Sequence, residues 1–279
     1  MKNSMPTIPI TIIKPKPGWQ LIDFKELNAY RGLFYFLVLR DIKIKYKQTV
    51  LGAAWAVIQP FFTMIVFSLF FGRLANVPSD SVPYPIFSYS ALAIWVYFSN
   101  SLSMSANSLV GNTELISKVY FPRMIVAVSP IIAGLLDFMI SLVVLFIMML
   151  FYGIKLTPAL ALFPVLTVLA MMIASGVGMW LAALNAQYRD IKYTVPFMIQ
   201  LWMFVSPIAY PASMVPEKFR FWYALNPMAG IVEGFRSILL GTIPFPSRMI
   251  MISAISAVLI LITGAMYFRR MERTFADVI

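Results

Sequence analysis

Residues 124–154 read MIVAVSPIIAGLLDFMISLVVLFIMMLFYGI and contain one charged residue, Asp137, between Arg123 and Lys155. A helix that crosses the hydrocarbon core of a bilayer needs about 20 mostly apolar residues. This stretch of 31 residues is therefore long enough for one membrane-spanning helix and too short for two.

The whole chain shares this apolar character. Of its 279 residues, 61% are hydrophobic and only 12% are charged, and the mean hydropathy is +0.83. A soluble domain has about 45–50% apolar and about 25% charged residues, so this chain has too few charges to cover a surface in water. The composition excludes a soluble enzyme, a disordered chain and a disulfide-stapled secreted domain, and it predicts an all-α integral membrane protein.

Similar windows without charge recur along the chain. Because each can hold one helix but not two, we predict six transmembrane helices, at about residues 51–71, 86–108, 125–151, 158–184, 195–210 and 249–268. Of the 22 Lys and Arg residues, 16 then fall on the side that holds both termini. Since cytoplasmic loops carry the excess of basic residues, we expect a cytoplasmic N-terminal segment over 1–50 and a cytoplasmic tail over 269–279. The net charge of +11 follows from this topology, and no nucleic-acid partner is expected.

Ahead of the first span, apolar residues recur at helical spacing with charged residues between them. They are Leu27, Tyr30, Leu33, Phe34 and Leu37. This pattern predicts an amphipathic interface helix at the cytoplasmic membrane face. The alternative is a soluble helix packed on a partner.

The region between the fifth and sixth spans, residues 216–241, contains twelve uncharged residues, FWYALNPMAGIV, at 221–232. Twelve residues cannot cross a bilayer as a helix, and Asn226-Pro227 interrupts them. We predict two short re-entrant helices here. The alternative is one irregular loop lying on the outer membrane surface.

Several kinds of chemistry are missing from the sequence. There is no Cys and no His, which removes thiolates and the commonest metal ligand. No phosphate-binding loop of the form G-x-x-x-x-G-K-[ST] is present. We expect no metal, no cofactor and no catalytic residue in this chain. The lone intramembrane carboxylate, Asp137, is a poor basis for proton coupling and is interpreted as a helix contact or a residue near a span end.

Four motifs occur outside the spans or at their edges. The first is RDIKIKYKQT at 40–49, followed by Leu51-Gly52 and Trp55; the second is NTELISKVYFPR at 112–123; and the third is NAQYRDI at 185–191. The fourth is Asn226-Pro227-Met228 with Glu233 and Arg236. From about residue 35 onward the chain resembles the permease subunit of bacterial polysaccharide ABC exporters, the family that moves O-antigen, capsular polysaccharide and teichoic acid.

This resemblance implies an assembly and a location. Two copies of the chain would pair with two ATP-binding cassette subunits in the bacterial inner membrane, and those partners would bind ATP and Mg²⁺. The implied substrate is a lipid-linked polysaccharide, with O-antigen as the expected cargo and undecaprenyl pyrophosphate as the expected carrier. The alternatives from other classes are a stand-alone channel or secondary transporter, and a membrane-embedded glycosyl- or acyl-transferase.

The resemblance also makes the loop at 111–123 a coupling helix that inserts into the ATPase. Glu114 and Lys118 are four residues apart and can pair on a helix, while Leu115, Ile116 and Tyr120 are expected to be exposed apolar anchors. The alternative is a plain helix end with topology-setting charges. The predicted ATPase-coupling residues are Glu114, Leu115, Ile116, Lys118, Tyr120 and Arg123, with Tyr188 and Arg189 as a minor contact or a structural loop.

Basic residues beside the first span have two interpretations. They either set the orientation of the chain or hold the pyrophosphate of a substrate taken from the cytoplasmic leaflet, since Arg and Lys bind phosphate well. They are Arg40, Lys43, Lys45 and Lys47.

A sugar polymer needs a wide, uncharged path, and aromatic faces stack on pyranose rings. The candidate channel-lining aromatics are Trp95, Tyr97, Phe98, Trp202, Phe204, Tyr210, Trp222 and Tyr223. The alternative is the aromatic belt found at the membrane interfaces of most polytopic proteins. A re-entrant gate is predicted at Asn226, Pro227, Glu233 and Arg236.

Overall fold

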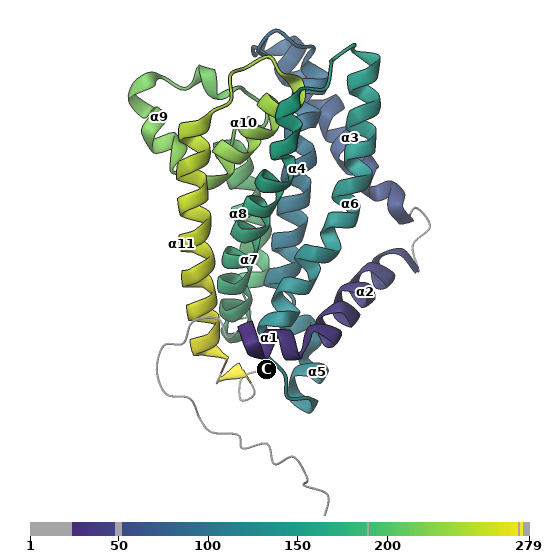
Figure 1. The fold of residues 1–279 in the computed structure, drawn as a ribbon, viewed down its shortest axis with the longest axis vertical. Coiled ribbons are helices and arrows are strands. Elements are labelled where there is room, and N and C mark those ends of the chain that lie inside the picture. The colour runs from purple at the N-terminus through teal and green to yellow at the C-terminus, as the bar shows by residue number, and fades with distance from the viewer. Residues whose placement is uncertain (1–23, 48–51, 189, 273, 276–279) are drawn as a thin grey trace, which may run out of the picture.

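The structure, a computed structural model, describes residues 24–47, 52–188, 190–272 and 274–275. Within these ranges every regular element is helical, which confirms the predicted all-α class (Figure 1). The predicted N-terminal segment before residue 24, Arg189 and the end of the tail at 276–279 lie outside the described residues. The α-helices are α1 (Phe24–Ala29), α2 (Arg31–Lys47), α3 (Trp55–Phe67), α4 (Tyr84–Ala106), α5 (Thr113–Lys118), α6 (Met124–Phe151), α7 (Phe163–Gln187), α8 (Ile191–Val205), α9 (Glu217–Ala224), α10 (Pro227–Leu240) and α11 (Ser247–Met271).

Short helical segments extend some of these elements. A 3₁₀ turn, η1 (Gly52–Ala54), leads into α3, and a π-helical segment, η2 (Ser68–Leu74), continues it. The other 3₁₀ turns are η3 (Val110–Asn112), η4 (Pro158–Leu162) and η5 (Ala212–Met214).

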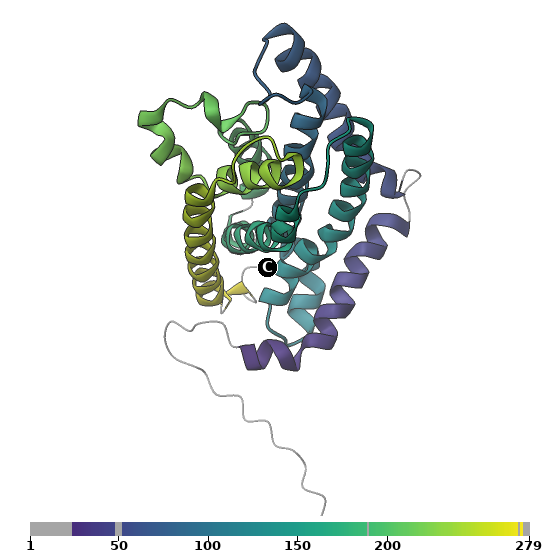
Figure 2. The same cartoon turned by 45° about the horizontal axis from the view of Figure 1, so that its top comes forward.

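The long helices form a bundle around α4, which contacts α3, α6, α7, α8 and α10. α11 packs along α7, and α2 packs along α6. α1 and α5 lie at one end of the bundle, whereas α9 lies at the other, and α10 lies across the bundle near α9 (Figures 1 and 2).

Within the described residues, four helices are long and apolar enough to cross a membrane: Gly52–Leu74, Met124–Phe151, Pro158–Gln187 and Ser247–Met271. They coincide with the predicted spans at 51–71, 125–151, 158–184 and 249–268. The other two predicted spans, 86–108 and 195–210, coincide in sequence with α4 and α8. α4 has 23 residues but is less apolar, and α8 has only 15 residues.

The polar character of α4 follows from its position. Most of its side chains are buried by neighbouring helices. Two of its buried hydroxyl groups bond to the backbone of α6: Tyr97 donates to the carbonyl of Ile131 at 3.1 Å, and Ser105 donates to that of Ala127 at 2.6 Å. Because protein rather than lipid surrounds α4, polar side chains are tolerated in it as bonds between helices.

Small residues allow α7 and α11 to approach closely. A side chain at Gly264 would collide with the backbone of Gly176, and one at Gly176 would lie 2.5 Å from the carbonyl oxygen of Ile260. Contacts between small residues are the usual way in which membrane helices pack without a hydrophobic driving force.

The helix predicted from residues 27–37 is present within α1 and α2, and its five predicted apolar residues share one face, because Leu27, Tyr30, Leu33 and Phe34 pack against the buried cluster that contains Leu37. Leu37 is buried in the bundle, whereas Tyr35, Phe36 and Ile44 are exposed. α2 also does not lie flat at the end of the bundle, since it rises obliquely beside α6 (Figure 1). An apolar surface on both sides fits a helix with protein on one side and lipid on the other.

Candidate functional site

Two short helices occupy the region predicted to contain them. α9 and α10 are separated by Leu225 and Asn226, and Asn226 caps α10 by accepting a hydrogen bond from the Met228 amide at 3.1 Å. Its Oδ1 also accepts a bond from the indole of Trp202 at 2.8 Å, and its amide donates to Ser206 at 3.0 Å. Asn226 therefore joins the end of α8 to the start of α10.

Glu233 and Arg236 form an ion pair inside the bundle. Their side chains are 4% and 1% exposed, and the Arg236 guanidinium lies 3.2 Å from the Glu233 carboxylate. Arg236 also donates to the Ile208 carbonyl at 3.0 Å and lies over the ring of Phe87 at 3.6 Å from its centroid. Glu233 accepts a bond from the Ala212 amide at 2.6 Å. These bonds fix α10 to α4 and to the segment after α8, so the pair is part of the scaffold in this conformation.

The predicted coupling loop forms η3 and α5. Glu114 and Lys118 pair at 3.7 Å, and their side chains are 91% and 73% exposed. Tyr120 is 72% exposed, as expected of an anchor, and Val119 beside it is 50% exposed. Nothing in the sequence distinguishes Val119 from any other apolar residue at a helix end.

Two predicted coupling residues face inward. Ile116 was expected to be exposed but is 3% exposed, in a cluster with Leu37 of α2 and Phe268 of α11. The backbone amide and the guanidinium of Arg123 donate to Glu272 at 2.8 and 2.7 Å, just after α11. Leu115 is partly buried against the same cluster. Ile116 of α5 thus belongs to the same buried cluster as residues of α2, α6 and α11.

Tyr188 follows α7 and lies at the same end of the bundle as the coupling loop. In the last turn of α7, Asn185 donates a hydrogen bond at 3.0 Å to the carbonyl of Ala106, which ends α4 shortly before that loop. The Tyr188 side chain is 52% exposed. Nearby, the ammonium of Lys192 lies over the ring of Tyr193 at 4.8 Å.

The four basic residues predicted to bind pyrophosphate all lie in α2 and fall into two kinds. Arg40 pairs with Asp41 at 2.8 Å, and Asp41 accepts a bond from Ser129 of α6 at 2.8 Å. Lys43 and Lys47 are exposed.

Lys45 pairs with Asp137 of α6, and the Tyr46 hydroxyl donates to the same carboxylate. The cation that balances Asp137 is thus 92 residues away in the sequence, which is why reasoning about its own span found none. Asp137 contacts another helix, as one of the two sequence-based interpretations proposed.

The predicted aromatic residues also divide. Trp95, Tyr97 and Phe98 are at most 3% exposed and pack inside the chain, although Tyr97 also lines a pocket. Trp202 lies against Phe98, with ring centroids 5.1 Å apart.

The remaining four aromatics lie nearer the surface. Phe204 and Trp222 are 51% and 68% exposed, while the hydroxyls of Tyr210 and Tyr223 lie 3.4 Å apart and both side chains are partly buried.

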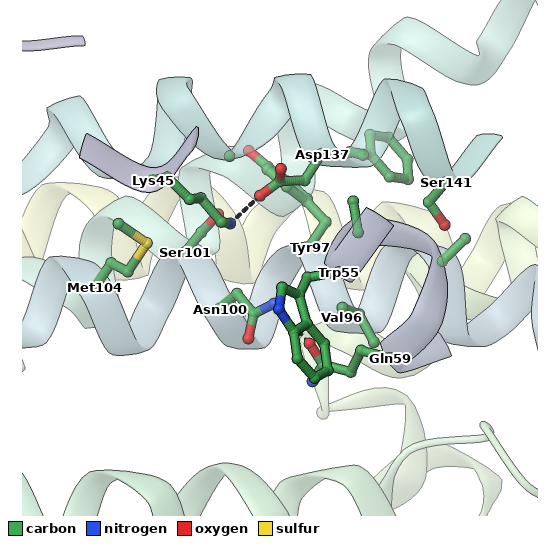
Figure 3. A pocket seen from close by; sticks show the side chains of 14 residues that line it. Lys45, Trp55, Gln59, Val96, Tyr97, Asn100, Ser101, Met104, Asp137 and Ser141 are labelled. Carbon is green, nitrogen blue, oxygen red and sulfur yellow. Dashed lines mark hydrogen bonds and ion pairs between the residues drawn. The ribbon is translucent and has the colours of Figure 1, made fainter. Parts of the chain in front are cut away.

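A pocket of about 100 Å³ lies between α2, α3, α4 and α6 (Figure 3). Its polar lining includes the Lys45–Asp137 pair on one side, and Gln59 of α3 with Asn100 of α4 on another. Trp55 of α3 also lines it and is 53% exposed. Among the described residues, no three His, Cys, Asp or Glu side chains gather as metal ligands do.

The buried polar core and the apolar helices long enough to cross a membrane are those of a helical membrane protein. The chain belongs to the ABC-2 type transporter family, whose sequence profile matches residues 32–240. This confirms the predicted family and makes the chain a multi-pass membrane protein. Members of this family are the permease subunits of ABC transporters and are not themselves enzymes.

Individual relatives are similar over most of the chain. The O-antigen export system permease protein RfbA of Myxococcus xanthus is 29% identical over 91% of this chain and 97% of its own length. An RfbA of Klebsiella pneumoniae is 27% identical over 88% of this chain and 96% of its own. The polysialic acid transport protein KpsM of Escherichia coli is 24% identical over 71% and 77%.

Proposed function

We propose that this chain is the membrane-spanning subunit of an ATP-driven exporter that moves a lipid-linked polysaccharide across the bacterial inner membrane. The observation that carries the proposal is the similarity to a named O-antigen export permease over 91% of this chain and 97% of that protein. The proposed cargo is an O-antigen type of glycan on an undecaprenyl pyrophosphate carrier.

The proposed topology has six spans with both termini in the cytoplasm. α4 qualifies as a span because its polar groups bond inside the bundle. α8 is about 22 Å long at 1.5 Å per residue, so the segment after it completes the crossing. α9 and α10 then lie at the outer side as re-entrant helices, opposite α5 (Figure 1).

The proposed assembly is a homodimer with two ATP-binding cassette subunits. Glu114, Lys118, Val119 and Tyr120 form an exposed surface in which an aromatic anchor has a charged rim, as protein interfaces require. ATP and Mg²⁺ bind to the partner, which carries out the hydrolysis.

Force from the ATPase reaches the spans through the inward side of α5. Ile116 belongs to one buried cluster with Leu37 of α2 and Phe268 of α11, so a displacement of α5 is expected to move α2 and the end of α11 together. Packed interfaces of this kind shift between discrete arrangements rather than deforming continuously.

The exposed pair Lys43 and Lys47 is proposed to capture the pyrophosphate. Arg40 and Lys45 are already balanced by carboxylates, whereas Lys43 and Lys47 extend from the exposed side of α2.

The proposal is tested by deleting the gene and measuring glycan on the cell surface, then restoring it with a tagged chain and identifying the proteins that co-purify. Deletion is expected to abolish surface glycan, and an ATPase with a phosphate-binding loop is expected to co-purify. Tyr120→Ala should lower both co-purification and export, while Tyr35→Ala, which removes a tyrosine 65% exposed on α2, should not.

Three results would contradict this function. Unchanged surface glycan after deletion would remove the export role. Export that persists without any ATPase would favour a stand-alone transporter. Glycosyl or acyl transfer by the purified chain would favour a transferase.

A further inference from the structure

The face of α3 and α4 around the pocket does not suit a lipid environment. Gln59 lies in the candidate span Gly52–Leu74 and is exposed, and Asn100 lies in α4 and is partly exposed. Asp137, at the same pocket, lies midway along α6, about 20 Å from either end at 1.5 Å per residue. Exposed amides at this depth are costly against hydrocarbon, so this face must contact water, a substrate or protein.

The two amides retain bonding capacity. Asn100 Nδ2 donates to Gln59 Oε1 at 3.2 Å. Within the described part of the chain this bond leaves the amide hydrogens of Gln59 and the amide oxygen of Asn100 for a ligand. A donor beside an acceptor matches a sugar hydroxyl, which both donates and accepts.

Trp55 supplies an apolar surface beside these groups. It lines the pocket from the first turn of α3, and 53% of the residue is exposed (Figure 3). An exposed indole face next to polar groups offers an amphipathic surface, which fits a sugar ring with an apolar face and hydroxyls at its edge.

The charges at the pocket favour a neutral ligand. Lys45 and Asp137 cancel, and the Tyr46 hydroxyl also holds the carboxylate. A phosphate entering here would meet Asp137 as well as Lys45 and would be repelled by the carboxylate, whereas sugar hydroxyls can bond to both groups.

We propose that this pocket is a carbohydrate-binding subsite on the export path, in which Trp55 stacks on a neutral sugar unit while Gln59, Asn100 and the Lys45–Asp137 pair bond its hydroxyls. The inference rests on the proposed function, because it assigns a place where this chain touches the glycan that it exports. The pyrophosphate is held elsewhere, at Lys43 and Lys47.

The first test measures surface glycan in a deletion strain that carries variants of the chain. Trp55→Ala, Gln59→Met and Asn100→Leu should each lower export by about tenfold, the effect of losing one good contact, while the chain accumulates normally in the membrane. Trp55→Phe should retain most of the export because it keeps an aromatic face. The control Thr263→Val removes an exposed hydroxyl from the middle of α11 and should export as the wild type does.

The second test locates the glycan directly. The photoreactive amino acid p-benzoylphenylalanine is placed at position 59 and, as the control, at position 263, and the cells are irradiated during export. A glycan-bearing adduct from position 59 and none from position 263 is expected.

Two results would overturn the subsite. One is an adduct at position 59 with a second copy of this chain and no glycan, which would make the face a subunit contact. The other is wild-type export by the combined Trp55→Ala, Gln59→Met and Asn100→Leu variant. If deletion of the gene itself leaves surface glycan unchanged, the proposed function fails first, so the two failures are distinguishable.

Discussion

Glu233 and Arg236, here called the closed pair, lie three residues apart on one helix and are 4% and 1% exposed. Lys45 and Asp137, the open pair, join two helices and are 36% and 16% exposed. Backbone groups of Ala212 and Ile208 complete the bonding of the closed pair, whereas the open pair lines a pocket with Trp55 and two amides. Ion pairs thus serve two purposes in this chain. The pair that is shielded from solvent holds helices together, and the pair that lines a pocket is available to a ligand.

The largest expected effect is on the closed pair. Arg236→Met leaves the Glu233 carboxylate buried without its cation, which costs about 3–5 kcal/mol of folding free energy. The melting temperature and the yield of the purified protein should fall sharply. Arg220→Met is the matched control, because Arg220 pairs with Glu217 at the same spacing but is 53% exposed, and it should leave both unchanged. Equal stability of the two variants would show that the closed pair does not hold the scaffold.

A smaller loss of stability is expected at the open pair. Lys45→Met leaves the partly exposed Asp137 carboxylate with Tyr46, at a cost of about 1–2 kcal/mol. Adding Asp137→Leu should restore most of the stability, since replacing a whole ion pair by apolar residues is often neutral. Surface glycan should nevertheless stay low in the double variant. Recovery of export together with stability would make the open pair a mere helix contact.

Two asparagines extend the comparison with a still smaller effect on stability. Asn226→Ala removes the cap of α10 and the partner of the Trp202 indole, and should lower the unfolding free energy by about 1 kcal/mol. Asn100→Ala removes a pocket amide whose one side-chain bond within the described residues is to Gln59, and should lower export without a measurable change in melting temperature. Reversal of these two outcomes would contradict the assignment of scaffold and pocket.

The smallest effect on stability is expected at the coupling surface. Lys118→Met breaks a pair whose members are 73% and 91% exposed. The free energy of unfolding should therefore change by less than about 0.5 kcal/mol. ATP hydrolysis per glycan exported should rise, because a rim contact with the ATPase is lost. A large loss of stability would mean that α5 is held by this pair rather than by Ile116.

Charge-free windows predicted the long helices well, because charged side chains are costly at membrane depth wherever the helix lies in the bundle. The break at Asn226-Pro227 predicted the boundary between α9 and α10, since local backbone chemistry determines it. α4 and α8 were located by the same windows, although neither meets both the length and the apolarity of a lone span.

Side-chain direction could not be predicted in the same way. Trp95 and Trp55 both lie in apolar sequence, yet Trp95 is 3% exposed and Trp55 is 53% exposed, because the packing of other helices decides which face is covered. The burial of Ile116 has the same cause, because Leu37 and Phe268, which belong to the same cluster, are distant from it in the sequence. The partner of Asp137 could not be found for this reason either.

The most direct test of the account is transfer of a lipid-linked glycan across proteoliposomes that hold this chain and the ATPase with which it co-purifies. Transfer should require both proteins, ATP and Mg²⁺, and Asn100→Leu should lower transfer while ATP hydrolysis continues. Transfer by this chain alone, driven by an ion gradient, would contradict it, as would ATP hydrolysis by a stable complex that moves no glycan.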